Sequence, residues 1–274
     1  MTTVASLAVL QAPAHWRRLD FIADLHLQAG ADASFDAWRD FMRGTQADAV
    51  FILGDLFEVW VGDDAIVAAN ETDNFAARCA QVLTAAAQRL SVYFMHGNRD
   101  FLVGTSFAAT CSLTLLDDPT VLEFGGQRWL LSHGDALCLQ DTDYMKFRSQ
   151  VRSTQWQKLF LQKPLSERQE IGRQMRLQSE ESKRTGMANA VPLVDLDAQL
   201  TCEWLRTAGA DTLIHGHTHR PREHDLGQGL RRVVLSDWDL LASPVRASVL
   251  RLTKAATADE APGARLERLP AALA

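Results

Sequence analysis

The chain has 274 residues, of which 47% are hydrophobic and 23% charged, proportions that are ordinary for a folded globular protein and exclude disordered and collagen-like classes. Its 28 basic and 34 acidic residues give a net charge of −6, so a surface coated in cations for duplex DNA is not expected. No run of about 18 apolar residues occurs, and no basic stretch precedes the mildly apolar first residues, which argues against a membrane span and a secretory signal. Four scattered cysteines without a C-x-x-C pair indicate reduced thiols in a cytosolic protein.

Short apolar runs alternate with helical patterns along the chain, which predicts strands joined by crossover helices and hence an α/β fold. In chain order we expect a strand at 18–23, a helix at 34–43 capped by Ser34, a strand at 49–53, a helix at 72–90, and strands at 91–95, 121–124, 128–132, 211–214, 221–226 and 231–235. The run 49–53 is continuously apolar, which predicts burial on both faces. Beyond residue 255 the sequence becomes Ala-rich and loses its period, so we expect a loosely held tail.

A segment of different character, residues 141–189, interrupts this pattern. It has no strand pattern, and its apolar residues recur at helical spacing. Between Met145 and Ala190, ten basic and four acidic residues give +6, so the remainder of the chain carries −12. Alone, this segment is typical of an amphipathic helical hairpin with a solvated face, whereas beside a site it indicates a lid for an anionic or amphiphilic ligand. We therefore expect a core of residues 17–140 and 190–255, a helical lid insertion at 141–189 and a tail at 256–274.

Five short motifs follow strand-like runs: Asp24-Leu25-His26, Gly54-Asp55, Gly97-Asn98-Arg99-Asp100, His133-Gly134-Asp135 and Gly216-His217-Thr218-His219. In an open α/β sheet the carboxyl ends of the strands form the ligand crevice, so these remote residues are expected to meet there. Their Asp, Asn and His side chains are donors for divalent Mn, Zn or Fe, and the lack of cysteine argues against a structural zinc. Singly, each motif also occurs as a turn, a cap or a buried histidine. Together, in one order at strand ends, they indicate a metal centre.

Seven ligands are too many for one tetrahedral ion and suit two ions that share a carboxylate. The expected ligands of one ion are Asp24, His26, Asp55 and His219, and those of the other are Asp55, Asn98, His133 and His217, so that Asp55 bridges. Two ions about 3.5–4 Å apart can bind a bridging hydroxide and polarise a phosphoryl group for in-line displacement. Water bound to such a centre, with its pKa lowered toward 7, would be a nucleophile at neutral pH.

The five motifs, in this order, resemble the calcineurin-like metallophosphoesterase superfamily over roughly residues 21–235. The flanking words are similar to the UDP-2,3-diacylglucosamine diphosphatase family of lipid A synthesis: Ile22–Leu27, Leu53–Glu58, Trp60–Asp64, His96–Leu102 and His215–Pro221. This resemblance implies a layered β-sheet core flanked by helices, with two Mn²⁺ ions bridged by Asp55. It implies hydrolysis of UDP-2,3-diacylglucosamine to UMP and 2,3-diacylglucosamine 1-phosphate (lipid X) by attack of hydroxide on the α-phosphorus. It also implies a peripheral position on the cytoplasmic face of the inner membrane, in contact with membrane lipid.

The resemblance further assigns contacts with the substrate. Asn98, Arg99 and His217 would serve both catalysis and substrate binding, and Arg99 can offer a planar fork of donors to a phosphate oxygen. In the lid, the positions carried over are Asp141, Ser179 and Lys183. The chain departs from the family here, because Lys183 stands where many members have asparagine and Gly186 where many have lysine.

Two sets of residues have open roles. An apolar cluster in the lid either lines a groove for acyl chains or dips into the membrane interface, or else it packs the lid on the core; it consists of Trp156, Leu159, Phe160 and Leu161. His96 and His215 either orient ligands through hydrogen bonds or serve packing alone.

Alternative functions fit some features of this pattern. Another dimetal phosphoesterase, acting on a soluble phosphodiester or nucleotide, fits the core motifs, whereas the basic and apolar lid favours a lipid substrate. A non-catalytic scaffold should have lost ligands, and none of the seven is missing. A nuclease is chemically feasible, but the acidic body argues against nucleic acid as a partner. No P-loop word occurs.

Overall fold

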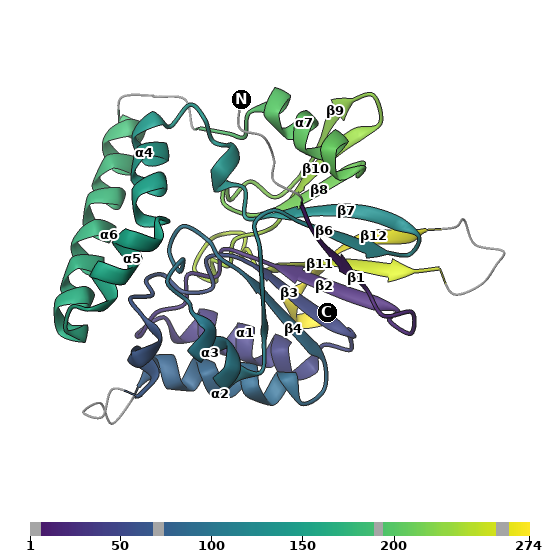
Figure 1. The fold of residues 1–274 in the computed structure, drawn as a ribbon. Coiled ribbons are helices and arrows are strands. Elements are labelled where there is room, and N and C mark those ends of the chain that lie inside the picture. Colours follow the sequence, from purple (N-terminus) through teal and green to yellow (C-terminus); the bar gives the residue numbers. More distant parts are fainter. Residues whose placement is uncertain (1–6, 68–73, 189–193, 256–262) are drawn as a thin grey trace.

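The computed structural model describes residues 7–67, 74–188, 194–255 and 263–274. Within these residues, a pair of six-stranded sheets packs face to face, with helices outside them (Figure 1). The first sheet has the order β12-β11-β2-β3-β4-β5, and the second has the order β1-β6-β7-β8-β10-β9. The first consists of β2 (Arg18–Ile22), β3 (Ala49–Leu53), β4 (Ser91–Met95), β5 (Thr114–Leu116), β11 (Ser248–Lys254) and β12 (Ala264–Pro270). The second consists of β1 (Ala8–Gln11), β6 (Thr120–Phe124), β7 (Gln127–Ser132), β8 (Thr212–His215), β9 (Glu223–Gly227) and β10 (Leu230–Val234).

Parallel pairing brings the relevant strand ends together. Strands β2, β3, β4 and β5 run parallel to one another, as do β7, β8 and β10. Between the two sheets lies an apolar layer in which Phe51 stacks on Phe21 and on Tyr93, with ring centroids 4.9 Å and 4.7 Å away. Every residue of β3 is buried, which confirms the prediction from its unbroken apolar run.

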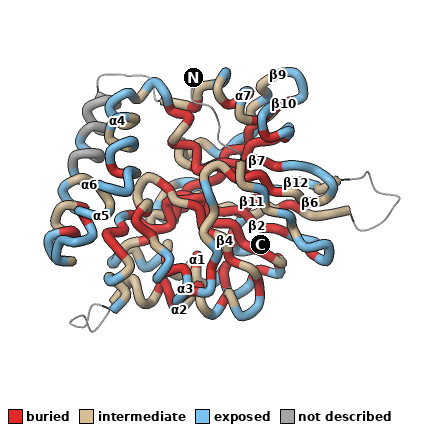
Figure 2. Tube along the Cα trace, in the orientation of Figure 1, coloured by how far each residue is buried: buried red, intermediate tan, exposed pale blue. Residues whose placement is uncertain are grey.

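Helices cover the outer faces of both sheets. Helices α1 (Asp32–Gly44), α2 (Phe75–Ala87) and α3 (Thr105–Cys111) lie on the first sheet (Figure 2). Trp38 of α1 and Phe107 of α3 are fully buried there. Helix α7 (Ala198–Ala208) covers the second sheet and buries Leu205 against it. The layered α/β architecture expected from the sequence is therefore confirmed.

A third group of helices stands beside these layers (Figure 1). It consists of α4 (Thr142–Val151), α5 (Thr154–Leu161) and α6 (Leu165–Ala188), and the described residues between 141 and 188 contain no strand. Its role as a lid remains a prediction. Among the described residues, no helix has the length and apolar character needed to cross a membrane.

Three local expectations differ from the structure. Residues 264–270 form β12, which pairs with β11 along its whole length, so a loosely held tail is wrong for this stretch. Helix α1 begins at Asp32, and its N-cap is Ala31 instead of Ser34. Helix α2 begins at Phe75, with the Asn74 side chain accepting from the Ala77 N–H, and the expected start at Thr72 lies outside the described residues.

Candidate metal centre

The predicted ligands gather at one end of the two sheets. The strands that precede them are β2 for Asp24 and His26, β3 for Asp55, β4 for Asn98, β7 for His133 and β8 for His217 and His219. Parallel strands end at the same edge of their sheet. Because the two sheets pack face to face, the residues that follow the strands of both sheets meet at this end. The structure thus brings all seven together in two adjoining groups.

The first group consists of Asp24, His26 and His219, whose ligand atoms all lie within 4.8 Å of one another. Nε2 of His26 is 3.2 Å from Nε2 of His219, and Asp24 Oδ1 is 3.4 Å from the same His219 atom. Asp55 Oδ2 lies 3.9 Å from His26 Nε2. Imidazole nitrogens and carboxylate oxygens that face one point are the donor set of a divalent transition metal.

The second group adjoins the first through Asp55. Asp24, Asp55 and His133 also place ligand atoms within 4.8 Å of one another. Asp55 Oδ2 is 3.8 Å from His133 Nε2, so this oxygen is almost equally distant from histidines of both groups. Asn98 Oδ1 lies 3.1 Å from His133 Nε2 and 2.9 Å from His217 Nδ1. This geometry suits a carboxylate shared between two cations.

Backbone strain marks the same residues. Among the described non-glycine residues, seven have positive φ, and five of these are predicted ligands: Asp24 (56°), His26 (49°), Asp55 (54°), His217 (68°) and His219 (53°). Left-handed backbone is costly for such residues and clusters at functional sites. Position 97 requires glycine because the Asp55 side chain lies against its backbone: a Cβ there would lie 2.0 Å from Asp55 Oδ1.

Hydrogen bonds behind the rings orient the imidazoles. His133 Nδ1 donates to the Leu53 carbonyl over 2.9 Å, and His26 Nδ1 lies 2.8 Å from Glu58 Oε2. The bond of His133 leaves its Nε2 directed at the cluster, the usual arrangement for a histidine ligand, and the close Glu58 carboxylate faces the Nδ1 side of His26. His217 N–H donates to both Asp24 oxygens, at 2.9 Å and 3.1 Å, which links the two groups through the backbone.

The site carries buried negative charge. Burial lowers the pKa of His133, but the carboxylates of Asp55 and Asp24 outweigh burial and raise it to about 9. Burial raises the pKa of Asp24, yet His219 and the neighbouring histidines hold it well below its usual range. Burial and the charge on His133 lower the pKa of His217 to about 4. Without cations, a proton on His133 therefore balances part of this negative charge.

Sequence reasoning assigned no role to Glu58, Asp135 or Tyr144, which line the same site. The Tyr144 ring stacks on His217 at a centroid distance of 6.0 Å, and its hydroxyl donates to Asp135. Asp135 is fully buried and also accepts from Arg148 Nε over 2.8 Å. Glu58 and Asp135 stand inside or beside the motifs, but only the fold reveals their partners.

Of the three substrate-binding residues predicted in the lid, the structure describes the side chain of Asp141. Asp141 is the N-cap of α4, where its Oδ1 accepts from the Tyr144 N–H over 3.0 Å. Ser179 and Lys183 fall on α6, and their side chains lie outside the described residues. Their contacts with substrate remain predictions.

The apolar cluster of the lid is divided in two. Trp156 and Phe160 stack on each other at 4.7 Å and pack against the core, and Phe101 approaches Trp156 at 6.1 Å. Leu159 and Leu161, in contrast, are 58% and 43% exposed. Packing therefore accounts for the first pair, and the second pair is free to meet an apolar surface.

The two histidines with open roles contact no predicted ligand side chain through the hydrogen bonds of the described structure. His96 Nε2 is 2.6 Å from the Val103 carbonyl. His215 Nδ1 is 2.8 Å from the Gly216 carbonyl, and its Nε2 lies 3.3 Å from Arg232. Burial and the Arg232 charge lower the pKa of His215 to about 3, so this ring is neutral.

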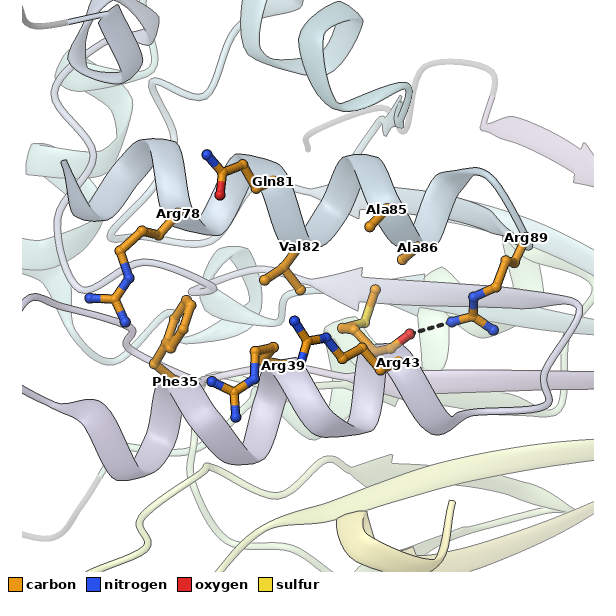
Figure 3. A pocket seen from close by; sticks show the side chains of 10 residues that line it. Phe35, Arg39, Arg43, Arg78, Gln81, Val82, Ala85, Ala86 and Arg89 are labelled. Atoms are coloured by element: carbon orange, nitrogen blue, oxygen red, sulfur yellow. Dashed lines mark hydrogen bonds between the residues drawn. The ribbon is translucent and has the colours of Figure 1, made fainter. Parts of the chain in front are cut away.

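A hollow of about 490 Å³ lies apart from this site, between α1 and α2 (Figure 3). Four arginines and Phe35 line it, and Arg78 lies over the Phe35 ring at 4.5 Å. Arg89 donates to the Met42 carbonyl across one end. None of the predicted ligands lines this hollow.

Comparisons with known proteins agree with the fold. The model of the calcineurin-like phosphoesterase family matches residues 17–221, and the chain belongs to that family. Curated proteins named UDP-2,3-diacylglucosamine hydrolase are similar over most of their length. The one from Chromobacterium violaceum is 46% identical over 80% of this chain and 90% of that protein, and the one from Ralstonia nicotianae is 44% identical over 85% and 88%. This similarity confirms the resemblance to UDP-2,3-diacylglucosamine diphosphatases that the motifs indicated.

Two further proteins align with this chain. The UDP-2,3-diacylglucosamine hydrolase from Pseudomonas aeruginosa is 42% identical over 80% of this chain and 90% of that protein. Among solved structures, a dimetal phosphatase from Danio rerio aligns with a TM-score of 0.47 at 13% identity, over 88% of this chain and 93% of that one.

Proposed function

We propose that this chain hydrolyses the pyrophosphate bond of UDP-2,3-diacylglucosamine and releases UMP and 2,3-diacylglucosamine 1-phosphate. The observation that carries the proposal is 42–46% identity to hydrolases named for that substrate, over 80–85% of this chain. Two adjoining groups of carboxylate and imidazole donors support the hydrolytic chemistry. The basic lid beside an acidic body supports an anionic substrate.

The donor set fits a pair of divalent cations, which we propose to be manganese. One ion would be held by Asp24, His26, Asp55 and His219, and the other by Asp55, Asn98, His133 and His217. Carboxylate and amide oxygens beside imidazole, without thiolate, suit manganese. The ring nitrogens of His26 and His219, 3.2 Å apart and facing each other, favour a cation between them. When bound, such ions polarise a phosphoryl oxygen and make water a nucleophile at neutral pH.

The side chains at the rim position the diphosphate. Arg99 is anchored by its backbone N–H, which donates to Asp55 Oδ1 over 2.8 Å, and its side chain is only 13% exposed. A guanidinium held there can pair with a phosphate oxygen beside the reacting phosphorus. Asn98 and His217 lie next to it, and we place both in contact with the same phosphate. The leaving sugar phosphate is already a stable anion, so its departure needs little general-acid help.

The lid would bind the rest of the substrate. We assign substrate contacts to Asp141, Ser179 and Lys183, on the resemblance to the hydrolase family. Leu159, Leu161 and Leu177 are 58%, 43% and 54% exposed on α5 and α6, amid the basic residues of the lid. Apolar side chains among cations suit a surface of anionic lipid, so we propose peripheral attachment to the cytoplasmic face of the inner membrane.

A product analysis tests this function directly. Purified protein with Mn²⁺ is given UDP-2,3-diacylglucosamine, and the products are identified by mass. We expect UMP and the diacyl sugar 1-phosphate. Recovery of UDP would contradict attack at the uridine-side phosphorus. Equal turnover of a water-soluble phosphodiester would contradict the lipid substrate, and activity with Mg²⁺ or Zn²⁺ but not Mn²⁺ would contradict the metal.

A further inference from the structure

One face of helix α6 lies on the segment that follows the shared ligand Asp55. Arg168, Gly172 and Arg176 are spaced four residues apart, so they occupy one face of the helix. All three contact residues 58–64, a segment after β3 that runs into the short 3-10 helix Asp63–Val67. We call this face the docking face of α6.

Arg168 fixes the first turn of the docking face. Its side chain is almost fully buried, and its guanidinium donates to the Val61 carbonyl and to both carboxylate oxygens of Asp64. Its Nε donates to the Lys163 carbonyl over 3.0 Å. A buried arginine satisfied in this manner holds two segments in a fixed relation, because breaking the contacts would leave a charge without partners.

Gly172 allows the helix to approach closely. A Cβ at this position would lie 2.8 Å from Val59 Cγ1 and 3.0 Å from Val61 Cγ1, closer than ordinary van der Waals contact. The glycine is buried, although glycine within a helix is destabilising by about 0.5–1 kcal/mol relative to alanine. The close contact between helix and loop accounts for this residue.

Arg176 connects the docking face to the metal centre. Its Nε lies 3.1 Å from Glu58 Oε1, and its Nη1 donates to Gln28 Oε1 over 2.6 Å. Glu58 Oε2 lies 2.8 Å from Nδ1 of His26, a predicted ligand. Glu58 is only 8% exposed, and its backbone N–H donates to the Leu27 carbonyl. One carboxylate therefore joins the lid helix to a ligand ring.

We propose that Glu58 is a positioning residue: while α6 is packed on residues 58–64, Glu58 holds the His26 ring in its ligand orientation. The position of the lid therefore sets the affinity of the ion on the His26 side. The inference rests on the proposed metal centre. It gives the lid a function apart from substrate contact. Displacement of α6 from residues 58–64 lowers the affinity of the ion on the His26 side, whereas the affinity of the ion held by His133 and His217 is retained.

The test uses the full chain with Mn²⁺ as titrant. Calorimetry measures the affinity of each ion, EPR measures the exchange coupling between them, and hydrogen exchange reports whether α6 is seated. In Gly172→Leu we expect faster exchange in α6 and a fall of about 10–100-fold in the affinity of one ion, the range for loss of a residue that orients a ligand. Gln174→Leu introduces the same side chain at an exposed position of α6 and should change neither affinity.

Glu58 is tested with the lid in place. Glu58→Ala should weaken the same single ion, and Glu58→Gln should retain more affinity because an amide oxygen can occupy the place of Glu58 Oε2, 2.8 Å from His26 Nδ1. If Gly172→Leu does not fold, Arg168→Met releases the helix by a different contact. The proposal would be overturned if both ions bound with normal affinity while α6 was displaced. It would also be overturned if hydrogen exchange in α6 were unchanged in Gly172→Leu, or if Glu58→Ala bound both ions normally. Fewer than two ions in the wild type would instead overturn the metal centre itself.

Discussion

Nε2 of His26 and Nε2 of His219 lie 3.2 Å apart, although 193 residues separate them in the chain. His26 follows β2 of the first sheet, and His219 follows β8 of the second, so packing of the two sheets creates this contact. Two imidazole nitrogens directed at each other repel as acceptors unless a proton or a cation lies between them. Packing of the two sheets therefore creates a pair of nitrogen donors that suits a cation.

Loss of the shared carboxylate should abolish the centre. In Asp55→Ala we expect turnover to fall by more than about 100-fold, above the range for a residue that only supports a ligand. Metal analysis should show that both ions are lost. Asp143→Ala, at a position that is 93% exposed on α4, is the matched control and should behave like wild type. Undiminished turnover in Asp55→Ala would favour a protein that keeps the fold without the metal chemistry.

Metal binding should depend on pH through His133. In the metal-free protein its pKa is raised to about 9, so it is protonated at neutral pH, whereas a ligand ring must be neutral at Nε2. We therefore expect Mn²⁺ affinity to rise with pH up to about pH 9 and then level off. Calorimetry at about pH 7.5 in two buffers of different ionisation enthalpy should show release of about one proton or more, because the carboxylates of Glu58, Asp55 and Asp24 outweigh burial and raise the pKa of His26 as well. Binding without proton release would contradict this.

Much of this arrangement could be predicted from the sequence. Unbroken apolar runs such as β3 predicted the central strands, and the ends of those strands predicted which donors meet. Strand β12 could not be found, because its alternating exposed and half-buried residues lack a strong apolar period and the sequence alone does not reveal its pairing with β11. Glu58 and Tyr144 were missed for a similar reason: their partners, His26 and His217, are fixed by the fold and not by sequence spacing.

Backbone strain at the ligands gives a prediction about stability. His219 has a φ of 53°, a conformation that costs a non-glycine residue about 1–2 kcal/mol. Both His219→Gly and His219→Ala lose the ligand, so their difference isolates the backbone. In metal-free protein, His219→Gly should be more stable by about 1 kcal/mol in denaturant unfolding.

The matched pair lies on an ordinary helix. At Gln199, an exposed position of α7, the alanine variant should be the more stable one, because glycine there costs backbone entropy without relieving strain. Equal stability of His219→Gly and His219→Ala would show that the left-handed backbone at this ligand carries no strain.

Attachment to lipid should depend on the exposed leucines of the lid. In Leu159→Gln/Leu161→Gln we expect partition onto vesicles with anionic lipid to fall about 10-fold or more, because burying a leucine is worth about 1.5–3 kcal/mol. Co-sedimentation measures this partition. Leu241→Gln changes a leucine that is 92% exposed and lies outside the lid, and should leave partition unchanged. Equal losses in both variants would contradict attachment through the lid.

The central claim is that side chains from both sheets enclose a pair of cations, and anomalous scattering from crystals grown with Mn²⁺ tests it most directly. The account predicts two peaks on either side of Asp55. One would lie among Asp24, His26 and His219, and the other among Asn98, His133 and His217. A single peak, or peaks away from Asp55, would contradict it.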